Sequence, residues 1–168
     1  MPQIILRINN EDDEIADGDD ICCYILDSSL SDARFAQAAA GGKMVLTQGE
    51  KAWEVCQRHN LDGVVVKIDP SRPVKVQIKP LREKLAHKTL GVIIPPRRHE
   101  AMLASEVEPE FVAFDLSGGN INIELIDWYN DLFLLPSALD FADAAPDMPS
   151  LKSDFVIINA QKSKNSGC

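Results

Sequence analysis

The sequence lacks the cysteine patterns that bind metals or carry redox chemistry. Its 168 residues include four cysteines, of which Cys22 and Cys23 are adjacent and no two form a CxxC pair. No histidine lies at metal-ligand spacing from a cysteine, so the sequence predicts no zinc site and no thioredoxin-type redox motif. We expect free thiols in a reducing compartment, which agrees with a cytoplasmic protein.

Positive charge is also scarce. Lysine and arginine number 17 against 26 aspartates and glutamates, for a formal net charge of −9. This balance argues against a nucleic-acid partner or an anionic membrane surface, although a local basic pocket for one phosphate group stays compatible with it. The first 14 residues show no basic region followed by an apolar run, and no stretch reaches membrane-spanning length. We therefore expect neither a signal peptide nor a membrane helix.

Common catalytic motifs are missing as well. The chain contains no GxSxG, GxGxxG or GxxxxGK[ST], which removes the usual signatures of serine hydrolases, dinucleotide-binding proteins and P-loop proteins. The acidic segment Asn9–Asp20 lacks the spacing and terminal glutamate of an EF-hand, and we interpret it as a solvated loop in preference to a cation site. Catalytic residues and cofactors are therefore not assigned from the sequence.

What the chain does have is a rhythm of eight short apolar, β-leaning runs, mostly separated by segments that favour helix or turn. The runs are Ile4–Ile8, Ile21–Leu26, Met44–Thr47, Gly63–Ile68, Leu90–Ile94, Phe111–Leu116, Leu134–Leu139 and Phe155–Asn159. This rhythm predicts a parallel α/β sheet closed into a barrel. Because a (β/α)8 barrel usually needs about 200 residues or more, we expect a compact TIM-type barrel with some short or missing helices. It would occupy residues 1–160 as one domain, with a polar tail over 161–168.

Helices are expected over 35–40, 50–59, 97–107 and 121–133. Segment Val74–Ile78 instead alternates apolar and polar residues, which predicts an edge strand or an extended segment. Pro80 is expected in the first turn of a helix that runs through Ala86. The links Asn9–Asp20 and Asp140–Ser153 are expected to lack long helices.

A barrel of this kind carries its function at the C-terminal ends of the strands. The fourth run contains Lys67 and is followed by Asp69, and the sixth run contains Asp115, so we expect these side chains to share one mouth. The sequence Ser117-Gly118-Gly119-Asn120 follows the sixth run and precedes a predicted helix. Converging backbone N–H groups at such a place favour an anion.

The sequence thus predicts a site for a small phosphorylated ligand at the barrel mouth. Its candidate ligand-binding residues are Lys67, Asp69, Asp115, Ser117, Gly118 and Gly119. The alternative interpretation is structural: the glycines form an ordinary turn and helix cap, and Lys67 forms a salt bridge with Asp115.

Three strand segments carry a resemblance to a known family. Leu61–Val66 (LDGVVV) resembles the strand ADGVHLG of thiamine phosphate synthases, Gly91–Ile93 (GVI) resembles their next strand GVS, and Pro109–Phe114 (PEFVAF) resembles their ADYVGFGP. The segments stand in the family's order, and the opening Pro2–Leu6 fits its short first strand. The resemblance implies a TIM-type barrel and, for the family, magnesium-dependent joining of a pyrimidine pyrophosphate to a thiazole phosphate.

The family's functional residues are largely replaced. Its Gln-x-Arg-x-Lys stretch at the second strand is Tyr24–Ser28 (YILDS) here, and its Asn-Asp at the third strand is Thr47-Gln48. Asp69 falls one place from the family's metal-ligand aspartate, and the glycine pair after the seventh strand is Asp140–Asp143 (DFAD). The resemblance therefore implies a degenerate or repurposed member without standard synthase activity.

Three functions are compatible with these observations. The first is a thiamine phosphate synthase-like barrel that lacks synthase activity and binds a small phosphorylated ligand. The second is a non-enzymatic interaction or regulatory protein that keeps the fold, and the third is a divergent transferase of thiamine phosphate metabolism. An acidic barrel of this size is also compatible with a homodimer.

Overall fold

The computed structural model describes residues 3–119, 121–143 and 153–162, which form eight strands and five helices. The strands are β1 (Gln3–Ile8), β2 (Ile21–Asp27), β3 (Met44–Gln48), β4 (Gly63–Lys67), β5 (Thr89–Ile94), β6 (Phe111–Asp115), β7 (Ser137–Ala142) and β8 (Phe155–Asn159). The helices are α1 (Asp32–Ala40), α2 (Ala52–His59), α3 (Val74–Leu85), α4 (Arg98–Ser105) and α5 (Ile123–Leu132). One helix thus follows each strand from β2 to β6.

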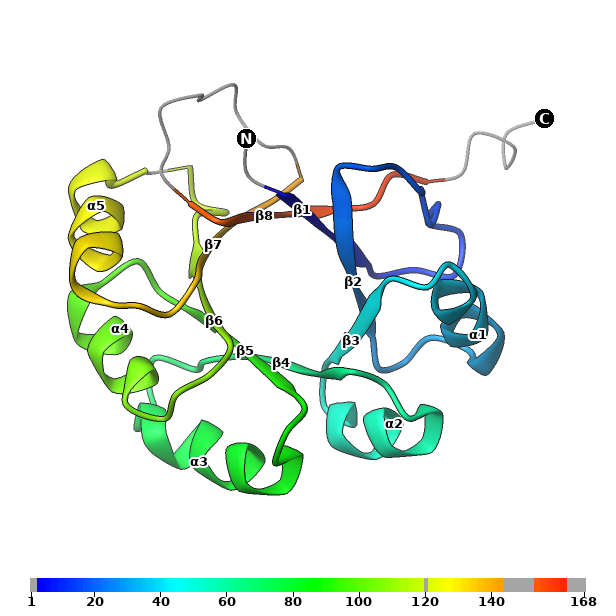
Figure 1. The fold of residues 1–168 in the computed structure, drawn as a ribbon, viewed down its shortest axis with the longest axis horizontal. Coiled ribbons are helices and arrows are strands. Elements are labelled where there is room, and N and C mark those ends of the chain that lie inside the picture. Colours follow the sequence, from blue (N-terminus) through cyan, green and yellow to red (C-terminus); the bar gives the residue numbers. More distant parts are fainter. Residues whose placement is uncertain (1–2, 120, 144–152, 163–168) are drawn as a thin grey trace.

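The strands form a closed barrel in the order β1 to β8, with the helices outside it (Figure 1). Neighbouring strands are parallel, and β8 closes the ring by pairing with β1, where Ile157 lies opposite Ile5. The predicted fold class, a TIM-type α/β barrel with missing helices, is confirmed. A chain of this length cannot place a helix after every strand. The Asn9–Asp20 link between β1 and β2 contains no helix, as predicted.

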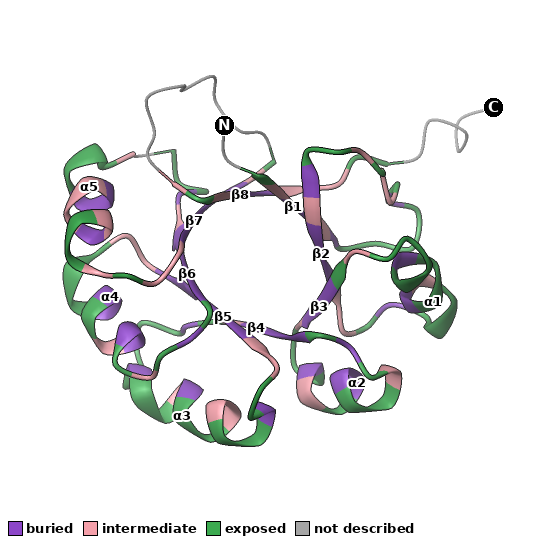
Figure 2. Ribbon diagram, in the orientation of Figure 1, coloured by how far each residue is buried: buried purple, intermediate pink, exposed green. Residues whose placement is uncertain are grey.

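Strand side chains alternate between two apolar cores. The smaller core fills the barrel interior and includes Ile25, Leu46, Val65 and Ile93. Adjacent strand residues such as Val64 belong to the larger core between the barrel and the helices. Burial on both faces explains the continuous apolar runs, since parallel strands are covered on both sides, and Figure 2 shows buried residues around the whole ring. The alternation also tells which strand residues point inward.

The prediction of an edge strand or extended segment over Val74–Ile78 is wrong, because these residues form the first turns of α3. The residues that this helix buries are Val74, Ile78 and Leu85. They share one helical face, whereas Val76, which completes the apparent alternation, is 61% exposed. Pro80 lies inside the helix rather than in its first turn. Burial of one face against the barrel outweighs the local preference of β-branched residues.

The seventh strand begins three residues later than predicted. The expected run was Leu134–Leu139, but β7 is Ser137–Ala142, and Leu134 is fully exposed. The reason is Pro136, whose missing N–H cannot join the hydrogen-bond ladder of a central strand. Asp140, which we predicted to open the link to the last strand, therefore lies within β7.

Asp13, in the link between β1 and β2, forms an isolated antiparallel bridge with Lys162. The Asp13 carboxylate also accepts hydrogen bonds from two backbone N–H groups at the start of the same link. Most of the predicted link between β7 and β8, residues 144–152, and most of the predicted tail, residues 163–168, lie outside the described residues. Within the described part of the chain, no helix has the length and apolar character to cross a membrane.

Candidate functional site

Polar and charged side chains gather at the C-terminal mouth of the barrel. Each follows an interior apolar residue by two positions on its strand, as Lys67 follows Val65 on β4, so alternation directs it inward. We name this set the mouth ring. It consists of Arg7, Asp27, Gln48, Lys67, Asp115, Asp140 and Asn159. Seven of the eight strands therefore contribute a polar group to one opening.

Arg7 and Asp140 form a bidentate pair in the mouth ring. Arg7 Nη1 donates to Asp140 Oδ1 at 3.0 Å, and Nη2 donates to Oδ2 at 2.5 Å. Nη1 also donates to Asn159 Oδ1 at 3.2 Å. The side chains are only 11% and 7% exposed, so each charge depends on the other in place of water. This pair is built into the barrel wall and holds its guanidinium firmly.

Lys67 and Asp115 form a looser pair, with Lys67 Nζ 3.4 Å from Asp115 Oδ2. The Lys67 side chain is 59% exposed. Asp115 Oδ1 also accepts hydrogen bonds from Ser117, at 3.0 Å from the backbone N–H and 2.6 Å from Oγ. Partial burial works to raise the pKa of Asp115, but the Ser117 hydrogen bonds and the nearby Lys67 charge outweigh burial and lower it. The structure thus brings together three of the residues selected from the sequence.

Asp69 belongs to a different local arrangement. It is exposed in the loop before α3, where its carboxylate accepts hydrogen bonds from the Ser71 backbone N–H (2.9 Å) and Ser71 Oγ (2.7 Å). These bonds lower the pKa of Asp69. Its own backbone N–H donates to Gln77 Oε1 at 2.8 Å. Asp69 shapes this loop, and among the described residues it makes no ion pair with Lys67.

Gly118 and Gly119 lie in the loop that leads from Asp115 toward α5. Gly119 has a φ of +86°, a left-handed conformation that favours glycine. A Cβ added at either glycine would meet no atom of the described residues within 4 Å. The space beside these glycines is therefore open to a molecule approaching from outside, although the Gly119 N–H already donates to the Leu116 carbonyl oxygen at 3.0 Å.

A cavity of about 100 Å³ lies on the β1–β3 side of the mouth. The residues that line it are Arg7, Asn9, Ile25, Asp27, Gln48 and Gly49. Gln48 Oε1 and Arg7 Nε are buried here and have no hydrogen-bond partner within the described ranges. Two residues that line this cavity thus carry one unpaired acceptor and one unpaired donor.

Sequence reasoning selected the loop residues after β4 and β6 and missed most of the mouth ring. The residues missed were Arg7, Asp27, Gln48, Asp140 and Asn159. A usable signal existed, because each stands two positions after an inward apolar residue. That signal required knowing which residue of each run faces the interior, and a run that is apolar on both faces does not reveal it.

The mouth ring contains three carboxylates and two cations. Its net charge therefore does not favour anions, and a phosphate group would depend on Lys67 and the open glycine backbone. No cluster of three histidine, cysteine, aspartate or glutamate side chains that could hold a metal ion occurs in the part of the chain that the structure describes.

A scan against protein-family models finds no match for the chain, and neither does a search of the curated proteins. The class that the fold defines is therefore a TIM-type α/β barrel with missing helices. The glycines that carry the resemblance to thiamine phosphate synthases have packing roles here. A Cβ at Gly63 would lie 1.9 Å from the Thr89 carbonyl oxygen, and one at Gly91 would lie 2.2 Å from the Phe111 ring. These contacts account for the matched glycines by packing alone.

Proposed function

We propose that the barrel mouth binds a small phosphorylated molecule. Its phosphate would lie against the Gly118-Gly119 backbone, with Lys67 supplying the countercharge. The observation that carries this proposal is the pair of exposed Lys67 with half-buried Asp115, directly before two glycines that have open space beside them. Backbone N–H groups and a lysine ammonium together are a common solution for holding phosphate.

The Lys67–Asp115 pair supports the proposal because it can be exchanged at low cost. Ion pairs at exposed positions contribute about 0–1 kcal/mol, and the Lys67 side chain is more than half exposed. Asp115 retains two hydrogen bonds from Ser117 when the lysine turns away. Lys67 is thus free to contact a phosphate without leaving a bare carboxylate behind.

The remainder of the ligand would extend toward the β1–β3 side of the mouth. The buried Gln48 Oε1 accepts and Arg7 Nε donates, which suits a ligand with both a donor and an acceptor. The resemblance to thiamine phosphate synthases favours phosphates of that metabolism, with binding rather than synthesis as the activity. A non-enzymatic interaction protein and a divergent transferase are the two alternatives that the experiment below separates.

Thermal unfolding in the presence of thiazole phosphate or inorganic pyrophosphate, each with and without magnesium, tests the proposal. A ligand that binds only the folded state raises the melting temperature by mass action. Lys67→Ala should remove this rise, whereas Lys79→Ala, at an exposed position of α3, should preserve it. If none of these compounds raises the melting temperature, the phosphate proposal is wrong and an interaction protein becomes the better interpretation. Formation of thiamine phosphate from the pyrimidine pyrophosphate and thiazole phosphate, with release of pyrophosphate, would indicate the transferase.

A further inference from the structure

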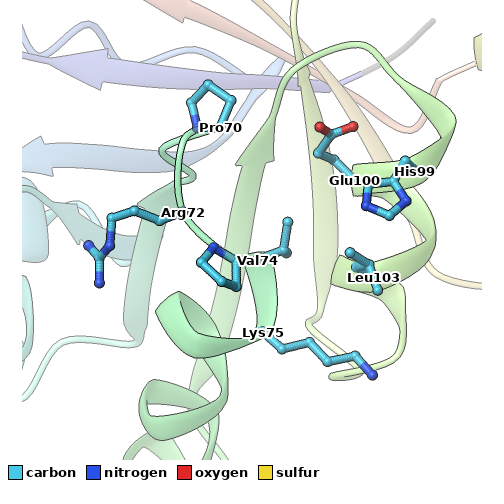
Figure 3. Close-up of a pocket in the computed structure, with 8 residues that line it drawn as sticks. Pro70, Arg72, Val74, Lys75, His99, Glu100 and Leu103 are labelled. Carbon is cyan, nitrogen blue, oxygen red and sulfur yellow. The ribbon is translucent and has the colours of Figure 1, made fainter.

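A groove of about 340 Å³ lies outside the barrel, between the N-terminal parts of α3 and α4. Figure 3 shows the loop carrying Pro70 and Arg72 on one side and His99, Glu100 and Leu103 of α4 on the other. Pro70, Pro73, Val74 and Leu103 make the walls largely apolar. Small-molecule sites in proteins have volumes of about 300–1,000 Å³ with apolar walls and few polar groups. The groove is therefore large enough for a small organic molecule.

One buried carboxylate lines this apolar groove. Glu100 is only 7% exposed, and its Oε1 accepts a hydrogen bond from Arg97 Nη2 at 2.8 Å. Its Oε2 is buried and has no hydrogen-bond partner among the residues that the structure describes. A buried acceptor without a donor costs about 1–3 kcal/mol, and more when it is charged. A hydrogen-bond donor to Glu100 Oε2 would therefore be stabilising.

Helix capping does not supply this donor. Glu100 is the third residue of α4, where a glutamate often turns back to accept from the N-cap backbone N–H. Here the N-cap is Arg97, and its N–H already donates to the Pro95 carbonyl oxygen at 2.7 Å. The second carboxylate oxygen thus has no role in the start of the helix.

The other cations around the groove do not serve Glu100 either. Lys75 of α3 is paired with Glu106, which ends α4 on the opposite side of the groove, and its ammonium points away from Glu100 (Figure 3). The Arg72 guanidinium also points away, toward solvent. The His99 ring, which lines the same groove, forms no hydrogen bond with Oε2 among the described residues either. A molecule that enters the groove is therefore the remaining source of a donor for Glu100 Oε2.

We propose that this groove binds a small organic ammonium with a short apolar tail. The ammonium head donates to Glu100 Oε2, while the tail lies against Pro70, Val74 and Leu103. A charged donor suits a buried carboxylate because charge-assisted hydrogen bonds are the stronger ones. The apolar walls favour a hydrocarbon tail over a second polar group. This site shares no residue with the mouth ring.

Titration of the full chain with n-butylammonium, n-butanol and butyrate, followed by NMR chemical shifts, tests the proposal. The three probes share a tail and differ in the head group. Butylammonium should bind at least about tenfold more tightly than butanol, in keeping with the extra strength of a charge-assisted bond. Butyrate should not bind, since it brings a second carboxylate to Glu100. Equal binding of all three, binding of butyrate alone, or no binding would overturn the proposal.

Two carboxylate variants locate the effect. Glu100→Gln keeps the shape of the side chain but removes its charge, and it should weaken butylammonium binding about tenfold, to the level of butanol. Glu106→Gln alters the exposed carboxylate that pairs with Lys75 and should leave binding unchanged. Equal losses in both variants would show a general charge effect and contradict the proposal.

Two further variants complete the test. If Glu100→Gln does not fold, Leu103→Ala provides the test. It should weaken the binding of butylammonium and leave the binding of methylammonium unchanged, because methylammonium has no tail to contact Leu103. An equal loss for both amines would contradict a tail contact. Lys67→Ala, which tests the barrel mouth, should leave butylammonium binding intact, so the two proposals succeed or fail separately.

Discussion

Arg7 and Asp140 join the first and seventh strands across β8, which lies between them in the barrel. The guanidinium meets both carboxylate oxygens, at 3.0 and 2.5 Å, and the two side chains are nearly buried. The first and last strands must pair for the barrel to close. The Arg7–Asp140 pair, which we call the clasp, lies where the barrel closes. The pair therefore both supplies charged groups to the barrel mouth and stabilises the closed barrel.

Removing one partner of this clasp should destabilise the protein strongly. Asp140→Ala leaves the Arg7 charge buried and unpaired, which costs about 3–5 kcal/mol. Asp12→Ala is the matched control, since Asp12 pairs with Lys162 at 3.8 Å on an exposed surface, where a change of less than about 0.5 kcal/mol is typical. Urea denaturation of both variants measures the difference, and similar small changes in the two would argue against a structural clasp.

The glycines of β4 and the β6–α5 loop should respond in opposite ways to alanine. Gly63→Ala places a Cβ 1.9 Å from the Thr89 carbonyl oxygen, so neighbouring strands must separate, and we expect a loss of about 3 kcal/mol or more. Gly118→Ala meets nothing within 4 Å and should change stability by less than about 0.5 kcal/mol. Thermal unfolding compares them. Normal stability of Gly63→Ala would mean that the β4–β5 spacing is wider than described.

Acid should selectively remove the contribution of Asp115. Its pKa is lowered in the folded protein from the usual 3.8, so the ionised carboxylate stabilises the fold above that value, and this stabilisation is lost as pH falls through the lower, folded pKa. Asp115→Asn should therefore be less stable than the parent chain at pH 7, and the gap should narrow below about pH 4. Urea midpoints between pH 7 and 3 measure the gap, with the exposed Asp131→Asn as control. A gap that is constant across this range would exclude the proposed titration.

The chain should not make thiamine phosphate. In the resemblance to the synthases, Tyr24–Ser28 stands where that family has its basic stretch, and Thr47-Gln48 where it has its Asn-Asp pair. In the barrel, Tyr24 faces the helices as part of the outer core, and Asp27 and Gln48 supply no positive charge for a pyrophosphate. Expression in a bacterium that lacks the synthase tests this expectation, and growth without added thiamine would disprove it.

Some elements could be predicted closely because local pattern and tertiary environment agree. The run Phe155–Asn159 matches β8 residue for residue, and Gly63–Ile68 differs from β4 by one residue. Where the two disagree, tertiary structure decides. Val74–Ile78 has the alternation of a strand but forms a helix, because α3 can bury one face against the barrel and leave Val76 exposed.

The sequence by itself determined the architecture, because eight apolar runs separated by helical or turn segments bury their surface most completely as a closed parallel sheet. It also determined that Lys67, Asp115 and Ser117 would meet, since residues at the ends of β4 and β6 share one end of the barrel. Only the tertiary structure decided which residue of each run points inward. The Arg7–Asp140 clasp and the buried Gln48 oxygen depend on that direction, and so they emerge only when the strands have closed into a ring.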